Sequence, residues 1–84
     1  MTDCVRVLFF ASARQSAGCS EMELPCEEAG MNDETFWTRL AEGHASLKSL
    51  RASVRLARNH EFLAAGELIK PGDEIALIPP VSGG

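Results

Sequence analysis

The spacing of hydrophobic residues changes twice along this chain, and this change restricts the fold more than any other feature. Apolar and polar residues alternate in residues 4–10 and 20–26, which is the period of a β-strand with one buried face. In residues 32–43 the apolar residues recur every three or four positions, as on an amphipathic helix. Alternation returns in residues 54–59 and 74–78. We therefore predict an α+β chain in which strands flank one main helix.

The first two predicted strands each have one face suited to a hydrophobic core. In the first strand that face carries Val5, Val7 and Phe9, and the other carries Arg6, Leu8 and Phe10. In the second strand Met22 and Leu24 share one face, and Glu21 and Glu23 share the other. Each strand is thus predicted to be buried on one side only.

We expect these two strands to pair as an antiparallel hairpin across a loop at residues 11–18, which is rich in small and polar residues. If Phe10 lies opposite Ser20, the same register brings Cys4 opposite Cys26. A disulfide switch between these two cysteines is conceivable in that register. We expect reduced thiols instead, because reduced cysteines are the rule in the cytosol.

The middle of the chain is predicted to hold the main helix. Asn32 and Asp33 are suited to cap its start, and Phe36 and Leu40 recur at helical spacing, with Trp37 in the core or at its rim. We expect the helix to end near Gly43. Residues 44–50 are ambiguous, and a further helical turn is one interpretation.

The C-terminal half is predicted to return to the sheet. Residues 54–59 form a strand with Val54 and Leu56 inward, and residues 59–61 turn the chain into a short strand at 62–64. A turn at Lys70-Pro71-Gly72-Asp73 leads into the last strand, residues 74–78. In that strand Ile75 and Leu77 share one face, and Ala76 and Ile78 share the other.

This order of elements resembles that of a ubiquitin-like β-grasp. The resemblance implies that the first and last strands lie parallel at the centre of a mixed sheet, with one main helix packed on one face. The 84 residues are enough for a single hydrophobic core. We expect one β-grasp domain over residues 1–84, with residues 79–84 as a protruding C-terminal tail.

The composition argues against several classes of function. The net charge of −4 disfavours a nucleic-acid partner, because such proteins gather basic residues on one face. The three cysteines, Cys4, Cys19 and Cys26, form no C-x-x-C pair, and His44 and His60 lack ligand spacing, so we expect surface histidines and no metal site. With no segment long enough to cross a bilayer and no convincing signal peptide, we expect a cytoplasmic protein without a membrane partner.

The end of the chain, PPVSGG, indicates a tail that enters another protein. Pro79 and Pro80 stop the sheet and favour an extended chain, and the four residues that follow reach roughly 13 Å. Gly83 and Gly84 have no Cβ, so a narrow channel admits them with the terminal carboxylate leading. Adenylation by ATP would activate this carboxylate, and a sulfur nucleophile could then replace AMP.

Ordering the tail costs on the order of 4 to 8 kcal/mol, so a docking surface on the folded part is also expected. Leu8, Phe10 and Ile78 lie on the predicted sheet face away from the helix, flanked by Arg6 and Arg55. Each of the three apolar side chains could contribute about 1.5 to 3 kcal/mol against a partner. The predicted partner-binding residues are Leu8, Phe10, Ile78, Pro80, Val81 and Ser82.

The stretches VLFFASARQSAG and PGDEIALIPPVSGG resemble the small subunit of molybdopterin synthase, the MoaD family of β-grasp sulfur carriers. The resemblance implies that Gly84 becomes a glycyl-adenylate and then a thiocarboxylate, with Gly83 giving the tail access. The thiocarboxylate would donate sulfur to cyclic pyranopterin monophosphate and build the molybdopterin dithiolene. Arg14 matches the family pattern without an assigned role, and Gln15 stands where an acidic residue is common.

The resemblance also implies partners. An activating enzyme would use ATP to adenylate the tail and supply sulfur, and the large synthase subunit would hold the catalytic groups in a heterotetramer of two small and two large subunits. No cofactor or metal is expected to bind this chain permanently. Two alternatives share the same acyl chemistry: a sulfur carrier for thiamin thiazole synthesis, and a ubiquitin-like protein modifier.

Overall fold

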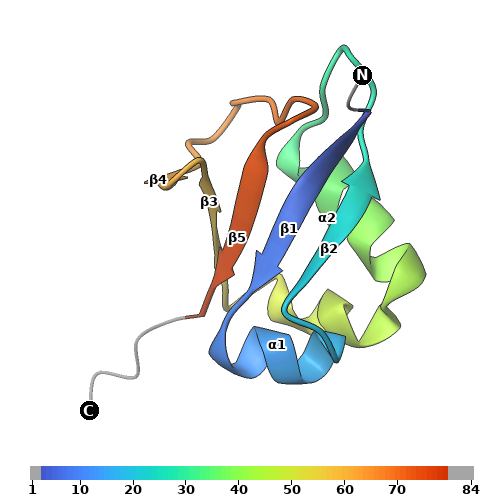
Figure 1. Cartoon of the computed structure of the whole chain (residues 1–84). Helices are drawn as coiled ribbons and strands as arrows, with labels where there is room; N and C mark the ends of the chain where they lie inside the picture. The colour runs from blue at the N-terminus through green and yellow to red at the C-terminus, as the bar shows by residue number, and fades with distance from the viewer. Residues whose placement is uncertain (1–2, 80–84) are drawn as a thin grey trace.

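The computed structural model describes residues 3–79, which form one five-stranded sheet with helices on one of its faces (Figure 1). The strands are β1 Cys4–Phe9, β2 Glu21–Pro25, β3 Arg55–Arg58, β4 Glu61–Phe62 and β5 Glu74–Ile78. The helices are α1 Ala11–Ala17, α2 Asp33–Gly43 and the 3₁₀ helix η1 Ala45–Leu50. The α+β class predicted from the spacing of apolar residues is confirmed.

The strand order is β2-β1-β5-β3-β4, so the first and last strands are neighbours near the centre of the sheet. β1 and β5 run parallel, with Val7 opposite Ile75 and Phe9 opposite Leu77. Every other pair of neighbouring strands is antiparallel. This mixed sheet with α2 across one face confirms the predicted β-grasp (Figure 1).

The core lies between the sheet and α2. On the sheet side it contains the predicted inward residues Val5, Val7, Phe9, Leu24, Ile75 and Leu77, all buried. On the helix side Phe36, Trp37 and Leu40 are buried, and the rings of Phe36 and Trp37 meet edge to face with centroids 5.8 Å apart. The predicted core position of Trp37 is confirmed, and this burial gives the sheet one dry face.

The start and end of α2 follow the predicted signals. The Asn32 side chain accepts a hydrogen bond from the Thr35 backbone N–H at 2.8 Å, and Asp33 and Glu34 lie in the first turn, where the helix dipole favours negative charge. The helix ends at Gly43 as predicted. The ambiguous segment that follows is the 3₁₀ helix η1, which buries Leu47.

The prediction of a loop at residues 11–18 was wrong, because most of this segment forms the helix α1. Its buried side is made by Ala13, with Ala17 packed partly against the core. Gly18 ends the helix in a left-handed conformation, φ 78°, and its N–H donates to the Arg14 carbonyl at 2.9 Å. Alanines give this short helix an apolar side without the large residues that reveal a helical period. β1 and β2 therefore pair across a helix rather than a tight turn.

The register that would bring Cys4 opposite Cys26 does not occur, and the observed pairing differs from it by one residue. Cys4 lies opposite Pro25, and Val5 lies opposite Leu24. A shift of one residue would turn the apolar face of β2 away from the core, so burial of Leu24 beside Val5 fixes the observed pairing. Cys4 and Cys26 consequently do not face each other: Cys26 is buried in the core, and both are free thiols.

The β3–β4 hairpin is tighter than predicted. β3 and β4 occupy Arg55–Arg58 and Glu61–Phe62, in place of the expected strands at 54–59 and 62–64. Asn59 and His60 join them, both with positive φ, 51° and 77°, which is the backbone of a two-residue hairpin turn of type I′. Asparagine tolerates this conformation, whereas histidine is strained there.

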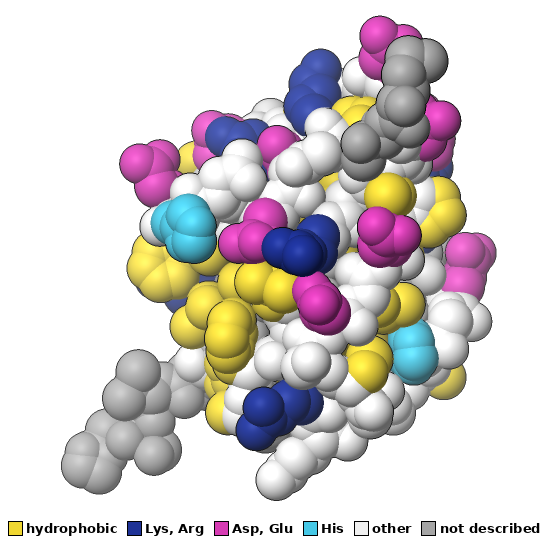
Figure 2. Space-filling model, in the orientation of Figure 1, with side chains coloured by type: hydrophobic (Ala, Val, Ile, Leu, Met, Phe, Trp, Pro, Cys, Tyr) yellow, Lys and Arg dark blue, Asp and Glu magenta, His cyan; other side chains and the backbone are white. Residues whose placement is uncertain are grey.

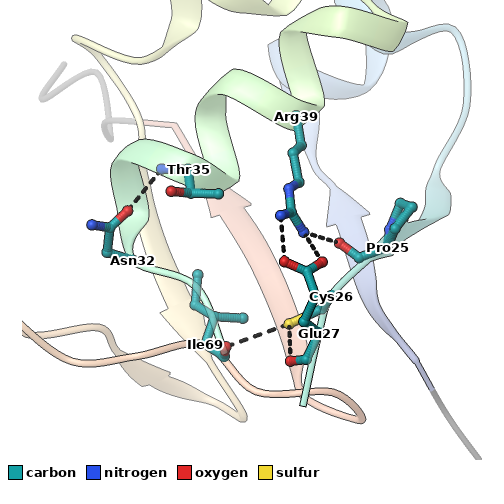
Figure 3. A network of polar contacts seen from close by, with 7 residues as sticks. All are labelled: Pro25, Cys26, Glu27, Asn32, Thr35, Arg39 and Ile69. Atoms are coloured by element: carbon teal, nitrogen blue, oxygen red, sulfur yellow. Dashed lines mark hydrogen bonds and ion pairs between the residues drawn. The ribbon is translucent and has the colours of Figure 1, made fainter. Parts of the chain in front are cut away.

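A polar network ties the end of β2 to α2 (Figure 3). The Arg39 guanidinium donates to both carboxylate oxygens of Glu27 and, at 3.0 Å, to the Pro25 carbonyl. The hydrogen bonds from Arg39 hold the pKa of Glu27 below its usual range. The Cys26 thiol donates to the Ile69 carbonyl at 3.5 Å, which links β2 to the segment before β5 (Figure 3). These contacts thus fix the end of β2 against α2 and against the segment before β5.

Candidate docking face

The face of the sheet opposite α2 is uncovered, and strand alternation decides which side chains it carries. Leu8 of β1 lies beside Ala76 of β5, Ala76 lies opposite Ala57 of β3, and Ala57 lies opposite Phe62 of β4. Side chains at directly paired positions point to the same face. One apolar row therefore runs across four strands. Ile78 follows on the same side of β5.

This row borders an open groove of about 310 Å³, which we call the open-face groove. It is lined by Leu8, Phe10, Ala57, His60, Phe62, Glu74, Ala76 and Ile78. Figure 2 shows hydrophobic side chains gathered on this face, over the ends of β3 and β5. Phe10 and Phe62 are 47% and 53% exposed, which is unusual for residues of this size.

The structure brings together the three predicted docking residues that it describes. All three line the open-face groove: Leu8 in β1, Phe10 directly after β1 at the start of α1, and Ile78 in β5. β1 and β5 are far apart in sequence but parallel neighbours in the sheet. Their role in binding a partner stays a prediction. The other predicted site residues, Pro80, Val81, Ser82, Gly83 and Gly84, lie outside the described residues.

Sequence reasoning missed most of the remaining groove. Ala57 and Phe62 join it because β3 pairs with β5, a neighbour that alternation within one strand does not identify. His60 reaches the rim because the hairpin turn is at residues 59–60. Alternation did predict that Ala76 lies on the same face as Ile78. The same rule applied to β3 would have placed Ala57 on the outer face, because its neighbour Leu56 points inward.

Charged residues flank the groove on two sides, as predicted for Arg6 and Arg55. Arg6 forms ion pairs with Glu21 at 3.1 Å and with Glu74 at 3.3 Å. The Arg55 guanidinium lies over the Phe62 ring, 3.9 Å from its centroid. The floor of the groove is therefore apolar. One border carries the charges of Arg6 and its glutamate partners, and the other is formed by the Phe62 ring with the Arg55 guanidinium over it.

The groove also lies where the chain leaves the sheet. β5 ends at Ile78, which is a groove residue, and Pro79 is the last described residue. The open-face groove therefore extends to the end of β5, next to the last described residue.

The described side chains form no evident catalytic centre. Residues 3–79 contain no cluster of three or more His, Cys, Asp and Glu that could hold a metal ion. Desolvation raises the pKa of the Cys4 thiol, with a further contribution from Glu23, and desolvation likewise raises that of Cys26. Both thiols are therefore poor nucleophiles at neutral pH. His60 is exposed as predicted, whereas His44 is partly buried.

Within that same part of the chain, no helix combines the length and the apolar character needed to span a membrane.

Comparison with known proteins places this geometry in a family. Residues 7–84 match the ThiS family. The molybdopterin synthase sulfur carrier subunit of Chlamydomonas reinhardtii is 34% identical over 82 residues, which cover 95% of this chain and 98% of that protein. Its similarity therefore extends over nearly the whole of both chains.

Solved structures agree in fold. SAMP1 of Haloferax volcanii, a small archaeal modifier protein, superimposes with a TM-score of 0.82 at 29% identity, covering 96% of this chain and 99% of that one. A Pyrococcus furiosus protein described as subunit 1 of a molybdopterin converting factor has a TM-score of 0.79 at 29% identity, covering 93% and 98%. The resemblance stated from the sequence is confirmed: the chain belongs to the ThiS family, and its relatives include sulfur carrier subunits of molybdopterin synthase.

Proposed function

We propose that this protein is the sulfur carrier subunit of a molybdopterin synthase. The observation that carries the proposal is the full-length similarity to a curated sulfur carrier subunit, which covers 98% of that relative. The open-face groove beside the end of β5 supports it, because a carrier needs a surface that delivers its tail to other proteins.

The chemistry takes place at the carboxylate of Gly84, to which the family match extends. An activating enzyme joins this carboxylate to AMP from ATP and releases pyrophosphate. A sulfur nucleophile then attacks the carbonyl carbon, AMP leaves, and a thiocarboxylate remains. In each transfer the thiocarboxylate sulfur displaces an oxygen from a carbon of cyclic pyranopterin monophosphate, and water then cleaves the resulting thioester. The sulfur stays on the pterin and the chain returns to its carboxylate form, so two transfers supply the dithiolene of molybdopterin.

The folded part serves for docking and holds no permanent cofactor in this account. Ordering four tail residues costs on the order of 4 to 8 kcal/mol. Leu8 and Ile78 are already partly buried and Phe10 is 47% exposed, so covering each of them in an interface contributes less than the about 1.5 to 3 kcal/mol of a fully exposed side chain, and the groove offsets part of the tail's ordering. The catalytic groups belong to the large synthase subunit, with which we expect a heterotetramer of two small and two large chains in the cytoplasm.

Reconstitution tests this function. The protein is mixed with its large subunit, its activating enzyme, ATP, a sulfur source and cyclic pyranopterin monophosphate, and molybdopterin is measured by mass spectrometry. We expect product in amounts that depend on the carrier. An absence of product, while the Chlamydomonas relative gives product with its own partners, would contradict the proposal.

A protein modifier is the second candidate, and the fold similarity to SAMP1 at 29% identity favours it. In that role Gly84 would form an isopeptide bond with lysines of other proteins after the same adenylation. Proteomic detection of lysines that carry a Gly-Gly remnant, lost on deletion of the gene, would support this function. The thiamin-thiazole alternative is separated by growth complementation of strains that lack each carrier.

A further inference from the structure

The arginines of this chain differ in whether a carboxylate pairs with them. Arg6, Arg39 and Arg58 each form an ion pair with a glutamate. Within residues 3–79, no hydrogen bond or ion pair involves the Arg55 side chain, although the chain has more acidic than basic residues. The guanidinium of Arg55 thus has N–H groups left for an outside acceptor.

Arg55 is nevertheless held in a defined place. Its guanidinium lies over the Phe62 ring at 3.9 Å, and a ring in this position restricts the long side chain while it leaves the donors at the guanidinium edge open. The neighbouring acidic residue, Glu61, lies opposite Arg58 in the hairpin and alternates to the other face from Phe62. No acid on β4 therefore competes for Arg55.

The position of Arg55 relates it to docking. Its Cα lies opposite that of Ile78, the last residue of β5 and part of the open-face groove, and Phe62 lines the same groove. A partner that covers the groove therefore also covers the Arg55–Phe62 pair. Covering an unpaired guanidinium without an acceptor removes it from water at a large free-energy cost, so the partner must provide one.

We infer that Arg55, stacked on Phe62, is a recognition element that receives a carboxylate from the partner into which the tail is inserted. This inference rests on the proposed function and adds a property of the partner: an aspartate or glutamate next to the apolar side chains that enter the groove. A carboxylate fits best because its two oxygens match the fork of guanidinium N–H groups. The chain as a whole has a net charge of −4, so an acidic group of a partner is attracted at a cation such as Arg55 and repelled by much of the remaining surface, which favours one orientation.

Binding of the large synthase subunit to the full chain, measured by calorimetry, tests the inference. We expect Arg55→Ala to weaken binding about tenfold to a hundredfold, the range for losing a hydrogen bond that involves a charged group. Phe62→Leu keeps apolar contact but frees the guanidinium, and should weaken binding about twofold to fivefold. Arg51→Ala is the matched control, since Arg51 is also exposed and has no ion pair but, unlike Arg55, is not stacked on a residue of the groove. It should leave affinity within about twofold of the wild type.

A carbodiimide crosslink identifies the acceptor. In the Arg55→Lys variant the introduced amine should form an amide with an aspartate or glutamate of the large subunit, which peptide mapping locates. The wild-type chain contains only two lysines, Lys48 and Lys70, so the background is small. Substituting the mapped acid by its amide should then reproduce the loss seen with Arg55→Ala.

The outcomes separate the two proposals. Wild-type protein that binds normally, with Arg55→Ala equal to Arg51→Ala and no crosslink from the new amine, would overturn this inference alone. Wild-type protein that does not bind the large subunit would overturn the proposed function and this inference with it.

Discussion

The two faces of the sheet differ in how far their side chains are buried. The face under α2 carries Val5, Val7, Ile75 and Leu77, none of which has exposed area. The other face carries the alternate residues of the strands, and in its groove Phe10 and Phe62 are about half exposed. The first face holds the fold together, and the second keeps apolar surface free for a partner. A substitution should therefore affect stability or docking according to its face.

The largest difference is expected between adjacent residues of β5. Leu77→Ala removes a fully buried side chain, and should lower the free energy of unfolding by about 2 to 5 kcal/mol. Ile78→Ala, on the half-exposed open face, should lower it by only about 1 kcal/mol. Urea denaturation monitored by Trp37 fluorescence measures both. Equal losses for the two variants would break the distinction between the faces.

Docking should show the opposite order. Phe10→Ser should weaken binding of the large subunit by about tenfold to a hundredfold, because it removes an exposed ring from the groove. Leu68→Ser is the control, since Leu68 is 43% exposed but does not line the groove. Calorimetry measures the affinity of the large subunit for both variants. If Leu68→Ser weakens binding as much as Phe10→Ser, the open face is not the docking site.

The β3–β4 turn at the rim of the open-face groove should contain backbone strain at His60. His60 has φ 77°, so His60→Gly should raise the free energy of unfolding by about 0.5 to 1 kcal/mol. Asn59→Gly in the same turn should lower it, because the Asn59 side chain accepts from the Glu74 N–H at 3.0 Å and donates to Asp73 at 3.2 Å. Thermal and urea unfolding of both variants provide the test. A stabilising Asn59→Gly would contradict this account of the turn.

The smallest effect concerns the polar network on the helix side. Arg39 lowers the pKa of Glu27 in the folded state, so their pairing adds stability above the ordinary glutamate pKa of about 4.3 and loses it as the pH falls through the lower folded value. Glu27→Gln should therefore be less stable than the wild type at neutral pH, with the difference shrinking in acid. Urea midpoints at pH 7 and below pH 4 measure this. A difference that grows in acid would reverse the assigned sign.

The sequence predicted the face under α2 better than the open face, for a physical reason. Burial of Val7 or Leu40 depends on a local period, which one strand or helix displays alone. The groove depends on which strands become neighbours, and β3 meets β5 only in the folded sheet. Phe62 and His60 therefore escaped prediction, although Leu8, Phe10 and Ile78 were assigned to the correct face.

Two features depend on core packing that the pattern of the sequence does not show. α1 was taken for a loop because Ala13 and Ala17 supply its apolar side. The β1–β2 register in which Cys4 would face Cys26 does not occur, because the observed pairing of Val5 with Leu24 buries the apolar face of β2 in the core. The C-terminal glycines were recognised from sequence alone, and their role is a question of chemistry rather than of fold.

In the proposed function, sulfur is carried on the terminal carboxylate and the folded part only docks. Intact mass spectrometry after loading is the most decisive test of this claim. Wild-type protein incubated with its activating enzyme, ATP and a sulfur source should exchange one oxygen for sulfur, mapped to Gly84. The Gly84→Val variant should bind the activating enzyme but gain little or no sulfur, because its side chain hinders the channel and the carbonyl. Addition of a sulfur atom to Cys4, Cys19 or Cys26, without exchange at the terminus, would contradict the claim.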